Sequence, residues 1–177
     1  MTLPRPSLQR MTAADLRAMC WLLGQPRAAG RARLARAISR LGDGPLYVLL
    51  ALLLWLLGGA QGERFALAAA FAYGVEVPAF VLLKHLIKRP RPADSLDSLC
   101  AFIQPADRFS FPSGHTAAAF VMATLLATLF PLVATPALVF ASLVGLSRVL
   151  LGVHYPTDIA AGAVLGAACA LLGLGLL

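Results

Sequence analysis

Apolar residues occur in five long runs along the chain. They cover positions 45–60, 65–83, 114–130, 132–151 and 157–177. A helix needs about 20 mostly apolar residues to cross a bilayer. The first run is short, so we expect its helix to begin earlier, near Ile38 or Leu41. The pattern predicts an all-α fold, a polytopic transmembrane helical bundle with about five spans.

The first 41 residues follow a different pattern. Leucine, methionine and tryptophan alternate with arginines between positions 14 and 41, and Gly24, Pro26 and Gly30 interrupt the run. Such a pattern is typical of basic amphipathic helices that lie in the membrane interface. A sixth span is possible but less favoured, because the uninterrupted apolar runs are short. We therefore expect a basic amphipathic interfacial segment, 1–41, followed by a transmembrane domain, 42–177.

Composition supports the membrane interpretation and limits the binding partners. The chain is 59% hydrophobic and only 13% charged, whereas roughly a quarter of the residues of a soluble domain are charged. The net charge of +7 suits anionic lipid headgroups or phosphate substrates. Nucleic acid is excluded as a partner, because the basic residues lie between apolar runs instead of forming a polar surface interleaved with aromatics.

Residues suited to chemistry gather where the apolar runs begin or end. If successive runs cross the membrane in turn, all of these positions lie on the same face of the bilayer. Two follow the second run, two open the third, one closes the fourth and two open the fifth. They are Lys84, Arg91, Ser113, His115, Arg148, His154 and Asp158.

These residue types fit the binding of a phosphate group. A lysine supplies a point charge, and an arginine supplies a planar fork that can bind two oxygens. Backbone N–H groups at a helix N-terminus add further donors. The Pro112–His115 segment provides such a start, where Ser113 adds a hydroxyl and Gly114 leaves room for close approach.

The two histidines can divide the labour of phosphoryl transfer. Asp158 follows His154 by four residues, a spacing that can bring its carboxylate to the ring, fix the tautomer and stabilise a cation formed on attack. This predicts His154 as the nucleophile. His115, at a helix start and without a sequence-local carboxylate, is left as the acid that protonates the leaving oxygen.

At these residues the sequence resembles a known family. K-x6-RP is present from Lys84 to Pro92, PSGH from Pro112 to His115, and SR-x5-H-x3-D from Ser147 to Asp158. Together these segments are similar to the three-part signature of the PAP2 (type 2 phosphatidic acid phosphatase) superfamily. Three ordered motifs are far more specific than any one of them. The resemblance covers roughly residues 45–177 and identifies 42–177 as a PAP2-type catalytic domain.

The resemblance implies a lipid phosphatase that works through a phosphohistidine intermediate. In that role His154 is the nucleophile, Asp158 orients it and His115 donates the proton. The phosphate would be held by Lys84, Arg91, Ser113, Gly114 and Arg148. Expected substrates are phosphatidic acid, phosphatidylglycerophosphate, or undecaprenyl phosphate or diphosphate. Alternatives are a lipid phosphotransferase and a catalytically silent lipid-binding protein.

No cofactor is expected, and the sequence argues against a metal ion. It contains neither HExxH nor a tight carboxylate cluster, and basic residues surround the histidines. The expected partners are the lipid substrate and the bilayer, with no obligate protein partner. The 93–110 loop carries Asp94, Asp97, Asp107 and Arg108, which either contact substrates or are only solvated.

We expect a multi-pass protein of the inner (plasma) membrane. Every lysine and arginine except Arg64 falls on the active-site side of the predicted topology, which predicts a cytoplasmic catalytic face by the positive-inside rule. Bacterial members of the family resembled commonly face the periplasm instead. Both orientations stay open at this point.

Overall fold

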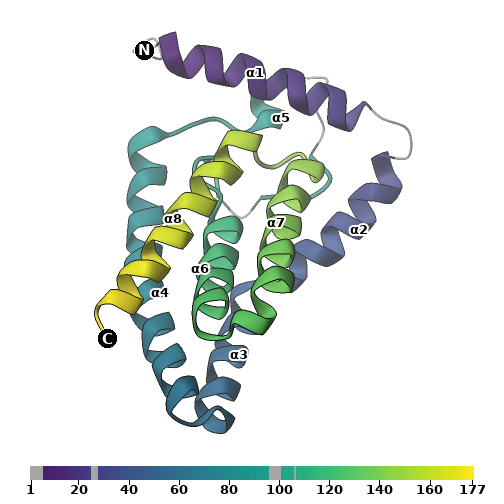
Figure 1. The fold of residues 1–177 in the computed structure, drawn as a ribbon. Helices are drawn as coiled ribbons and strands as arrows, with labels where there is room; N and C mark the ends of the chain where they lie inside the picture. The colour runs from purple at the N-terminus through teal and green to yellow at the C-terminus, as the bar shows by residue number, and fades with distance from the viewer. Residues whose placement is uncertain (1–5, 25–27, 96–100, 106) are drawn as a thin grey trace.

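All secondary structure in the computed structural model is helical over the residues that it describes, 6–24, 28–95, 101–105 and 107–177 (Figure 1). The predicted all-α fold is therefore confirmed. The elements are α1 (Pro6–Leu23), α2 (Ala28–Leu41), α3 (Gly44–Leu57), α4 (Gly59–Ile87), α5 (Pro92–Ser95), α6 (Gly114–Leu129), the 3-10 turn η1 (Pro131–Val133), α7 (Ala134–Leu150) and α8 (Pro156–Gly175).

The N-terminal segment forms two helices at one end of the bundle. Figure 1 shows α1 lying across that end, while α2 descends beside α7. Met19 of α1 is buried against Val149 and Tyr155. The predicted interruption is found after Leu23, but Gly30 lies inside α2, and Pro26 falls outside the described residues. The interfacial location of segment 1–41 stays a prediction.

The first apolar helix begins later than the sequence indicated. We expected a start near Ile38 or Leu41, whereas α3 begins at Gly44 and is bent by 43° from the end of α2. Pro45 stands in the first turn of α3, where its missing N–H costs nothing and its fixed φ favours a new helix. The chain therefore breaks its helix between α2 and α3.

A tight turn reverses the chain between α3 and α4. Gly59 has a φ of +57°, a left-handed conformation that glycine adopts without steric cost. At Gly62 an added Cβ would lie 1.8 Å from the Leu54 carbonyl oxygen. Small residues at this turn let α3 and α4 pack side by side and run antiparallel.

Helix α6 is the centre of the bundle and packs against α4, α7 and α8. Its side chains Val121 and Leu125 are fully buried together with Phe65 of α4. Close contact with α8 depends on glycine, because a Cβ at Gly166 would lie 2.1 Å from the Ala117 carbonyl oxygen. Small residues that let helix backbones approach are typical of membrane bundles.

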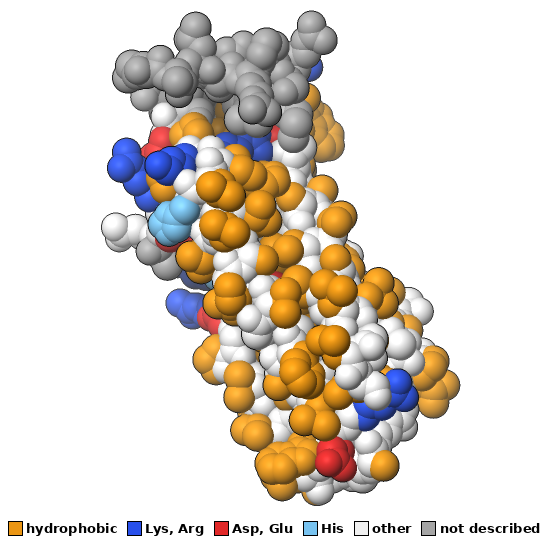
Figure 2. Space-filling model, turned by 90° about the vertical axis from the view of Figure 1, so that its left-hand side faces the viewer, with side chains coloured by type: hydrophobic (Ala, Val, Ile, Leu, Met, Phe, Trp, Pro, Cys, Tyr) orange, Lys and Arg blue, Asp and Glu red, His pale blue; other side chains and the backbone are white. Residues whose placement is uncertain are grey.

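Among the described residues, three helical segments are long and apolar enough to cross a membrane, namely Gly59–Ser95, Pro131–Leu150 and Pro156–Gly175. The bent pair α2 and α3 would be a fourth if its helices form one broken span, and α6 is a shorter apolar helix. Figure 2 shows hydrophobic side chains over much of one face, with most of the visible basic groups toward the upper end and others near the lower end. The chain is an integral membrane protein, and a count of five spans stays a prediction.

Substituting Gly166 by alanine should loosen the contact between α6 and α8. The new Cβ collides with backbone atoms that cannot rotate away, and overpacking of this kind costs about 1–3 kcal/mol. Thermal unfolding of purified protein in detergent, followed by circular dichroism, should show a lower midpoint. Gly74→Ala is the matched control, because a Cβ there meets nothing within 4 Å. Equal midpoints for the two variants would contradict this account of the packing.

Candidate active site

The three motif segments meet at the end of the bundle that α1 covers (Figure 1). Arg91 Nη1 donates to the carbonyl oxygen of Val153 at 2.6 Å. The N–H of Ser113 donates to the carbonyl oxygen of Asp158 at 3.1 Å. These bonds join the segment after α4, the start of α6 and the start of α8. The predicted convergence of the motifs on one end of the bundle is confirmed.

His154 is buried and held in one orientation. Its Nδ1 lies 2.7 Å from the carbonyl oxygen of Ser110 and 3.7 Å from Oδ2 of Asp158. A carbonyl can only accept, so a neutral ring here carries its hydrogen on Nδ1 and leaves a lone pair on Nε2. Burial is the main cause that lowers the pKa of His154 to about 4. The imidazole is therefore neutral at physiological pH, as a nucleophile must be.

From the sequence we expected Asp158 to fix the tautomer of His154. In the structure, the shorter contact of the ring Nδ1 is with the carbonyl oxygen of Ser110. Asp158 is fully buried, and its Oδ2 accepts the N–H of Tyr155 at 2.9 Å. This bond forms a cap on α8 and keeps the carboxylate beside the ring. A carboxylate at 3.7 Å still stabilises positive charge on the ring.

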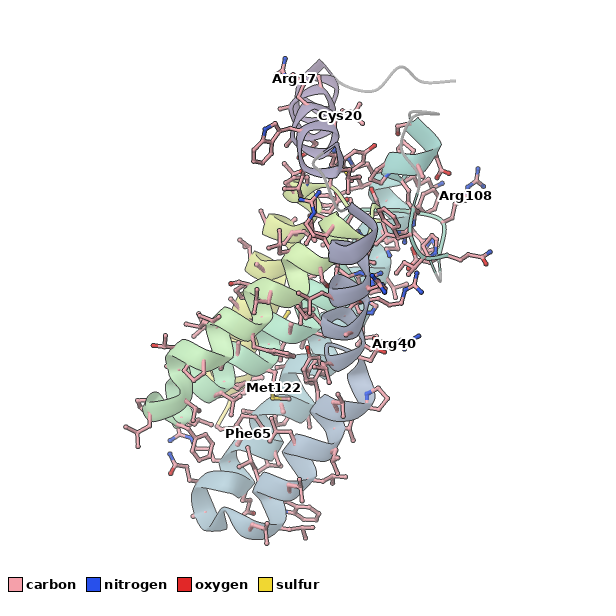
Figure 3. The ribbon with its side chains drawn as sticks, turned by 90° about the vertical axis from the view of Figure 1, so that its right-hand side faces the viewer. Arg17, Cys20, Arg40, Phe65, Arg108 and Met122 are labelled. Carbon is pink, nitrogen blue, oxygen red and sulfur yellow. The ribbon has the colours of Figure 1, made fainter. Side chains whose placement is uncertain are left out.

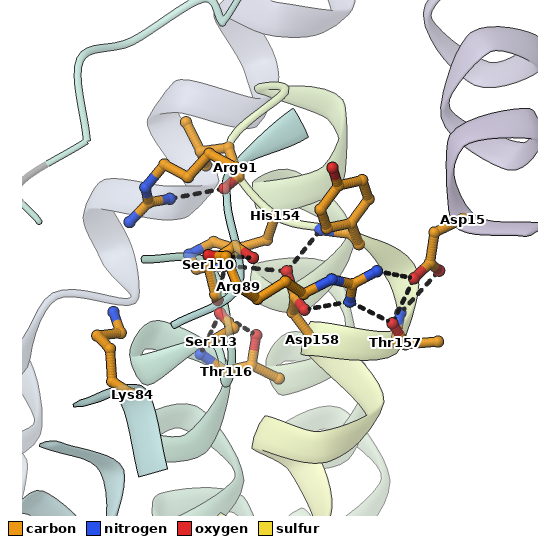
Figure 4. Close-up of polar contacts among 12 residues, drawn as sticks. Asp15, Lys84, Arg89, Arg91, Ser110, Ser113, Thr116, His154, Thr157 and Asp158 are labelled. Atoms are coloured by element: carbon orange, nitrogen blue, oxygen red, sulfur yellow. Dashed lines mark hydrogen bonds and ion pairs between the residues drawn. The ribbon is translucent and has the colours of Figure 1, made fainter. Parts of the chain in front are cut away.

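Arg89 holds Asp158 from the other side, and sequence reasoning missed it. Its Nη1 lies 2.6 Å from Oδ1 of Asp158 and its Nη2 lies 2.6 Å from Oδ2 of Asp15. The guanidinium also donates to the hydroxyl of Thr157 and lies 4.0 Å from the centre of the Tyr155 ring. Figure 4 shows this chain of contacts from Asp15 of α1 to the carboxylate of Asp158.

Lys84 and Arg91 point toward a common anion, the carboxylate of Asp107. Lys84 Nζ lies 2.7 Å from Oδ2, and Arg91 Nη2 lies 2.7 Å from Oδ1. Burial acts to raise the pKa of Asp107, but the two cations outweigh it and leave that pKa below its ordinary value. Both cations are buried, whereas the Asp107 side chain is 44% exposed. Of the other loop acids, Asp94 accepts the N–H of Arg91 at 3.4 Å, and Asp97 lies outside the described residues.

The start of α6 offers backbone donors. Ser113 is the N-cap, and its hydroxyl oxygen accepts the N–H and the hydroxyl of Thr116. The N–H of Ser113 donates to the backbone carbonyl oxygen of Asp158. The N–H groups of Gly114 and His115 are left, because the first N–H groups of a helix have no intrahelical acceptor. Gly114 packs closely against the ring of Phe80, because a Cβ added at Gly114 would lie 2.9 Å from the ring atoms.

Arg148 and His115 face a cavity on the α2 side of the site. Arg148 Nη1 donates to the hydroxyl of Ser39 at 2.7 Å. Its Nε is buried and has no hydrogen-bond partner in the described part of the chain. His115 lacks a sequence-local acid, but its Nε2 lies 3.0 Å from Oδ1 of Asp43, which precedes α3. This partner comes from 72 residues away, so sequence spacing could not reveal it.

Among the described residues, no three His, Cys, Asp or Glu side chains lie close enough together to hold a metal ion. The acids near the histidines are instead engaged by arginine and lysine, as with Asp158 and Asp107. The arrangement suits an anion held by cationic side chains and helix N–H groups.

Comparison with known proteins gives a consistent picture. A sequence profile of the PAP2 superfamily matches residues 64–176. The chain is 34% identical over 137 residues to decaprenylphosphoryl-5-phosphoribose phosphatase of Mycobacterium tuberculosis, covering 75% of this chain and 73% of the relative. Among solved structures, LpxE of Aquifex aeolicus aligns with a TM-score of 0.78 and 25% identity, covering 90% of this chain and 94% of that one.

A second solved structure is the PAP2-type phosphatidylglycerolphosphate phosphatase of Bacillus subtilis. It aligns with a TM-score of 0.71 and 28% identity, over 97% of this chain and 87% of that chain. This second alignment covers 97% of the chain, so it includes most of α1 and α2 as well as the motif-bearing helices.

Replacing Arg89 by glutamine should destabilise the protein strongly. Two buried carboxylates, Asp15 and Asp158, would lose their shared cation, and breaking a buried pair costs about 3–5 kcal/mol. We expect a large drop in the thermal midpoint in detergent. Lys88→Gln removes the same charge from the exposed neighbouring residue and should change the midpoint little. An Arg89→Gln variant as stable as the Lys88→Gln variant would show that the pair is not needed.

Proposed function

The chain belongs to the PAP2 superfamily and is a membrane lipid phosphatase, and we propose that it acts through a phosphohistidine formed on His154. Nε2 of His154 attacks phosphorus while the bond from phosphorus to the leaving oxygen breaks. His115 donates a proton to that oxygen. Water then attacks phosphorus and gives its proton to His115 while the bond from phosphorus to Nε2 breaks, which releases phosphate and restores the neutral His154. The single observation that carries this proposal is the buried ring of His154, whose Nδ1 is held by the carbonyl oxygen of Ser110, so that Nε2 is left for attack.

Asp158 stabilises the charged ring in this mechanism. When Nε2 is bonded to phosphorus, the imidazole becomes a cation, and the adjacent carboxylate offsets that charge. Arg89 is proposed to keep Asp158 in place and is a positioning residue. Its two hydrogen-bonded carboxylates leave it no role at the substrate.

The phosphate site is proposed to comprise Lys84, Arg91, Arg148 and the N–H groups at the start of α6. Charged donors in a site with little water stabilise the pentacoordinate transition state more than they would in bulk solvent. The Nε of Arg148 is buried and has no hydrogen-bond partner among the described residues, so we propose that it donates to a phosphoryl oxygen when substrate binds. Ser113 was expected to contact phosphate, and its bonds to Thr116 support a role in capping α6 and holding those N–H groups in position.

Asp107 occupies the position that a substrate phosphate would take between Lys84 and Arg91. A carboxylate and a phosphate both offer two oxygens at similar spacing, so each can bridge the two cations. Asp107 sits on an exposed loop. We propose that the substrate phosphate displaces this side chain on binding.

The apolar part of the substrate has a suitable place between α3 and α4. A cavity of about 510 Å³ there is lined mainly by apolar residues and extends from Gly44 past Tyr47 and Tyr73 to Glu76. Gly44 follows Asp43, the partner of His115. A lipid chain in this cavity would therefore leave its phosphate near His115.

We propose phosphatidic acid, phosphatidylglycerophosphate and undecaprenyl phosphate or diphosphate as candidate substrates, cleaved without a metal ion. The relatives named above support lipid phosphates that carry either a prenyl or a diacyl chain. We further propose the plasma membrane as the location. The excess of lysine and arginine at the catalytic end favours a cytoplasmic catalytic face.

Phosphate release from these lipids in detergent should depend on His154 and not on a divalent metal. His154→Ala should abolish turnover, and Asp158→Asn should lower kcat by about 10²–10⁴-fold with little change in KM, because the carboxylate acts on the charged ring. Activity should persist in EDTA and fall with vanadate. Loss in EDTA, or wild-type turnover by His154→Ala in folded protein, would rule out this mechanism.

Removing the Asp107 charge should strengthen the binding of free anions. In Asp107→Asn, Lys84 and Arg91 no longer have a carboxylate to release, so we expect the inhibition constants of phosphate and vanadate to fall by about tenfold, the equivalent of one charge-assisted bond. Glu63→Gln is the control, because it removes an exposed carboxylate at the opposite end of α4 from Lys84. If phosphate and vanadate inhibit Asp107→Asn more weakly than they inhibit the wild type, Asp107 helps to build the site instead of occupying it.

A further inference from the structure

A second cationic cavity lies beside the proposed phosphate site. Its volume is about 440 Å³, and it is enclosed by α2, the start of α6, the end of α7 and the 102–105 segment. Arg36, Arg40 and Arg148 contribute positive charge to its walls, together with His115 and Asp43. Nothing in the catalytic step described above uses Arg36 or Arg40.

We propose that this cavity binds a second phosphate group, carried by the leaving group of the substrate, and that Arg36 and Arg40 are its ligands. The inference rests on the proposed function and narrows its substrate class. It favours lipids with a second phosphate on the leaving side of the scissile bond, such as prenyl diphosphates and phosphatidylglycerophosphate. It disfavours phosphatidic acid, whose leaving group is an uncharged diacylglycerol.

The location of the cavity identifies it with the leaving group. In an in-line displacement the nucleophile and the leaving oxygen lie on opposite sides of phosphorus. His115, the proposed acid, lines this cavity, whereas His154, Lys84 and Arg91 do not. Arg148 also lines the cavity. It therefore lies between the transferred phosphoryl group and the second phosphate, which is carried by the leaving group.

The two arginines are arranged as a pair. Their spacing of four residues places Arg36 and Arg40 on one face of α2. Ser39 between them accepts a hydrogen bond from Arg148, which fixes this part of α2 to the end of α7. Arg36 Nη2 also donates to the carbonyl oxygen of Phe102 at 2.6 Å, which ties α2 to the far wall.

The charge balance of the cavity calls for an anion. Asp43 is the only acid among the described residues that line it, and it already pairs with His115. Arg40 is exposed and makes no side-chain hydrogen bond or ion pair within the described part of the chain, and Figure 3 shows it on the same side of the molecule as Arg108. A phosphate is the group that an arginine fork binds best with two parallel bonds.

Headgroups of the surrounding bilayer are the competing source of phosphate. Arg33 separates the two explanations, because it is an exposed arginine on α2 that does not line the cavity. A general attraction of α2 to anionic lipid depends on Arg33 as much as on Arg40. Of these three arginines of α2, a leaving-group site depends on Arg36 and Arg40 and not on Arg33.

The test compares kcat/KM for undecaprenyl diphosphate, phosphatidylglycerophosphate and phosphatidic acid in uncharged detergent micelles. Arg40→Gln should lower kcat/KM for at least one of the first two lipids by about 10–100-fold, as expected for a lost charged hydrogen bond. The value for phosphatidic acid should change less than about threefold, within the scatter of a surface substitution. The double variant Arg36→Gln/Arg40→Gln should widen this difference, and Arg33→Gln should match wild type.

Other outcomes are equally informative. Equal losses for all three lipids in Arg40→Gln, or no loss for any, would overturn the second phosphate site. A loss that appears only in vesicles with anionic lipid, and equally in Arg33→Gln, would assign the arginines to headgroups. His154→Ala is assayed in parallel, so a failure of the catalytic proposal is seen separately from a failure of this one.

Discussion

The buried contact of Arg89 with two carboxylates is the constraint on which the active site depends. Asp15, Arg89 and Asp158 come from α1, from the segment after α4 and from the start of α8, and each is almost fully buried. Three charges can leave water together only if their geometry is good and their remaining donors are satisfied. The contact therefore fixes where three distant parts of the chain meet, and it orients the carboxylate beside His154.

Much of the site could be predicted from sequence because phosphoryl transfer requires particular residue types at helix ends. Lys84, His115 and His154 stand out as polar residues beside long apolar runs. Arg89 does not, since in a basic stretch it is indistinguishable from an anchor at the end of a span. Asp15 carries one usable signal: it is the only acid among the first 42 residues, and a lone acid in a basic helix suggests a buried partner.

The helices themselves were predictable from apolar run length, but the break before α3 was not. Its position depends on Gly42 and Pro45, and on Asp43, which contacts His115 across 72 residues. A local pattern of hydrophobicity contains no information about such a distant partner. The same holds for Ser110, whose backbone carbonyl, not its side chain, accepts the bond from His154.

The position of α2 links substrate charge to the need for acid catalysis. In the proposed mechanism, departure of an alkoxide requires a proton from His115, because an alkoxide is a poor leaving group. A leaving group that carries its own phosphate next to the scissile oxygen leaves more readily as an anion, provided that cations stabilise it. Arg148 lies beside His115, and Arg36 and Arg40 line the cavity beyond it. The same end of the bundle thus combines a proton donor for one kind of leaving group with fixed positive charge for the other.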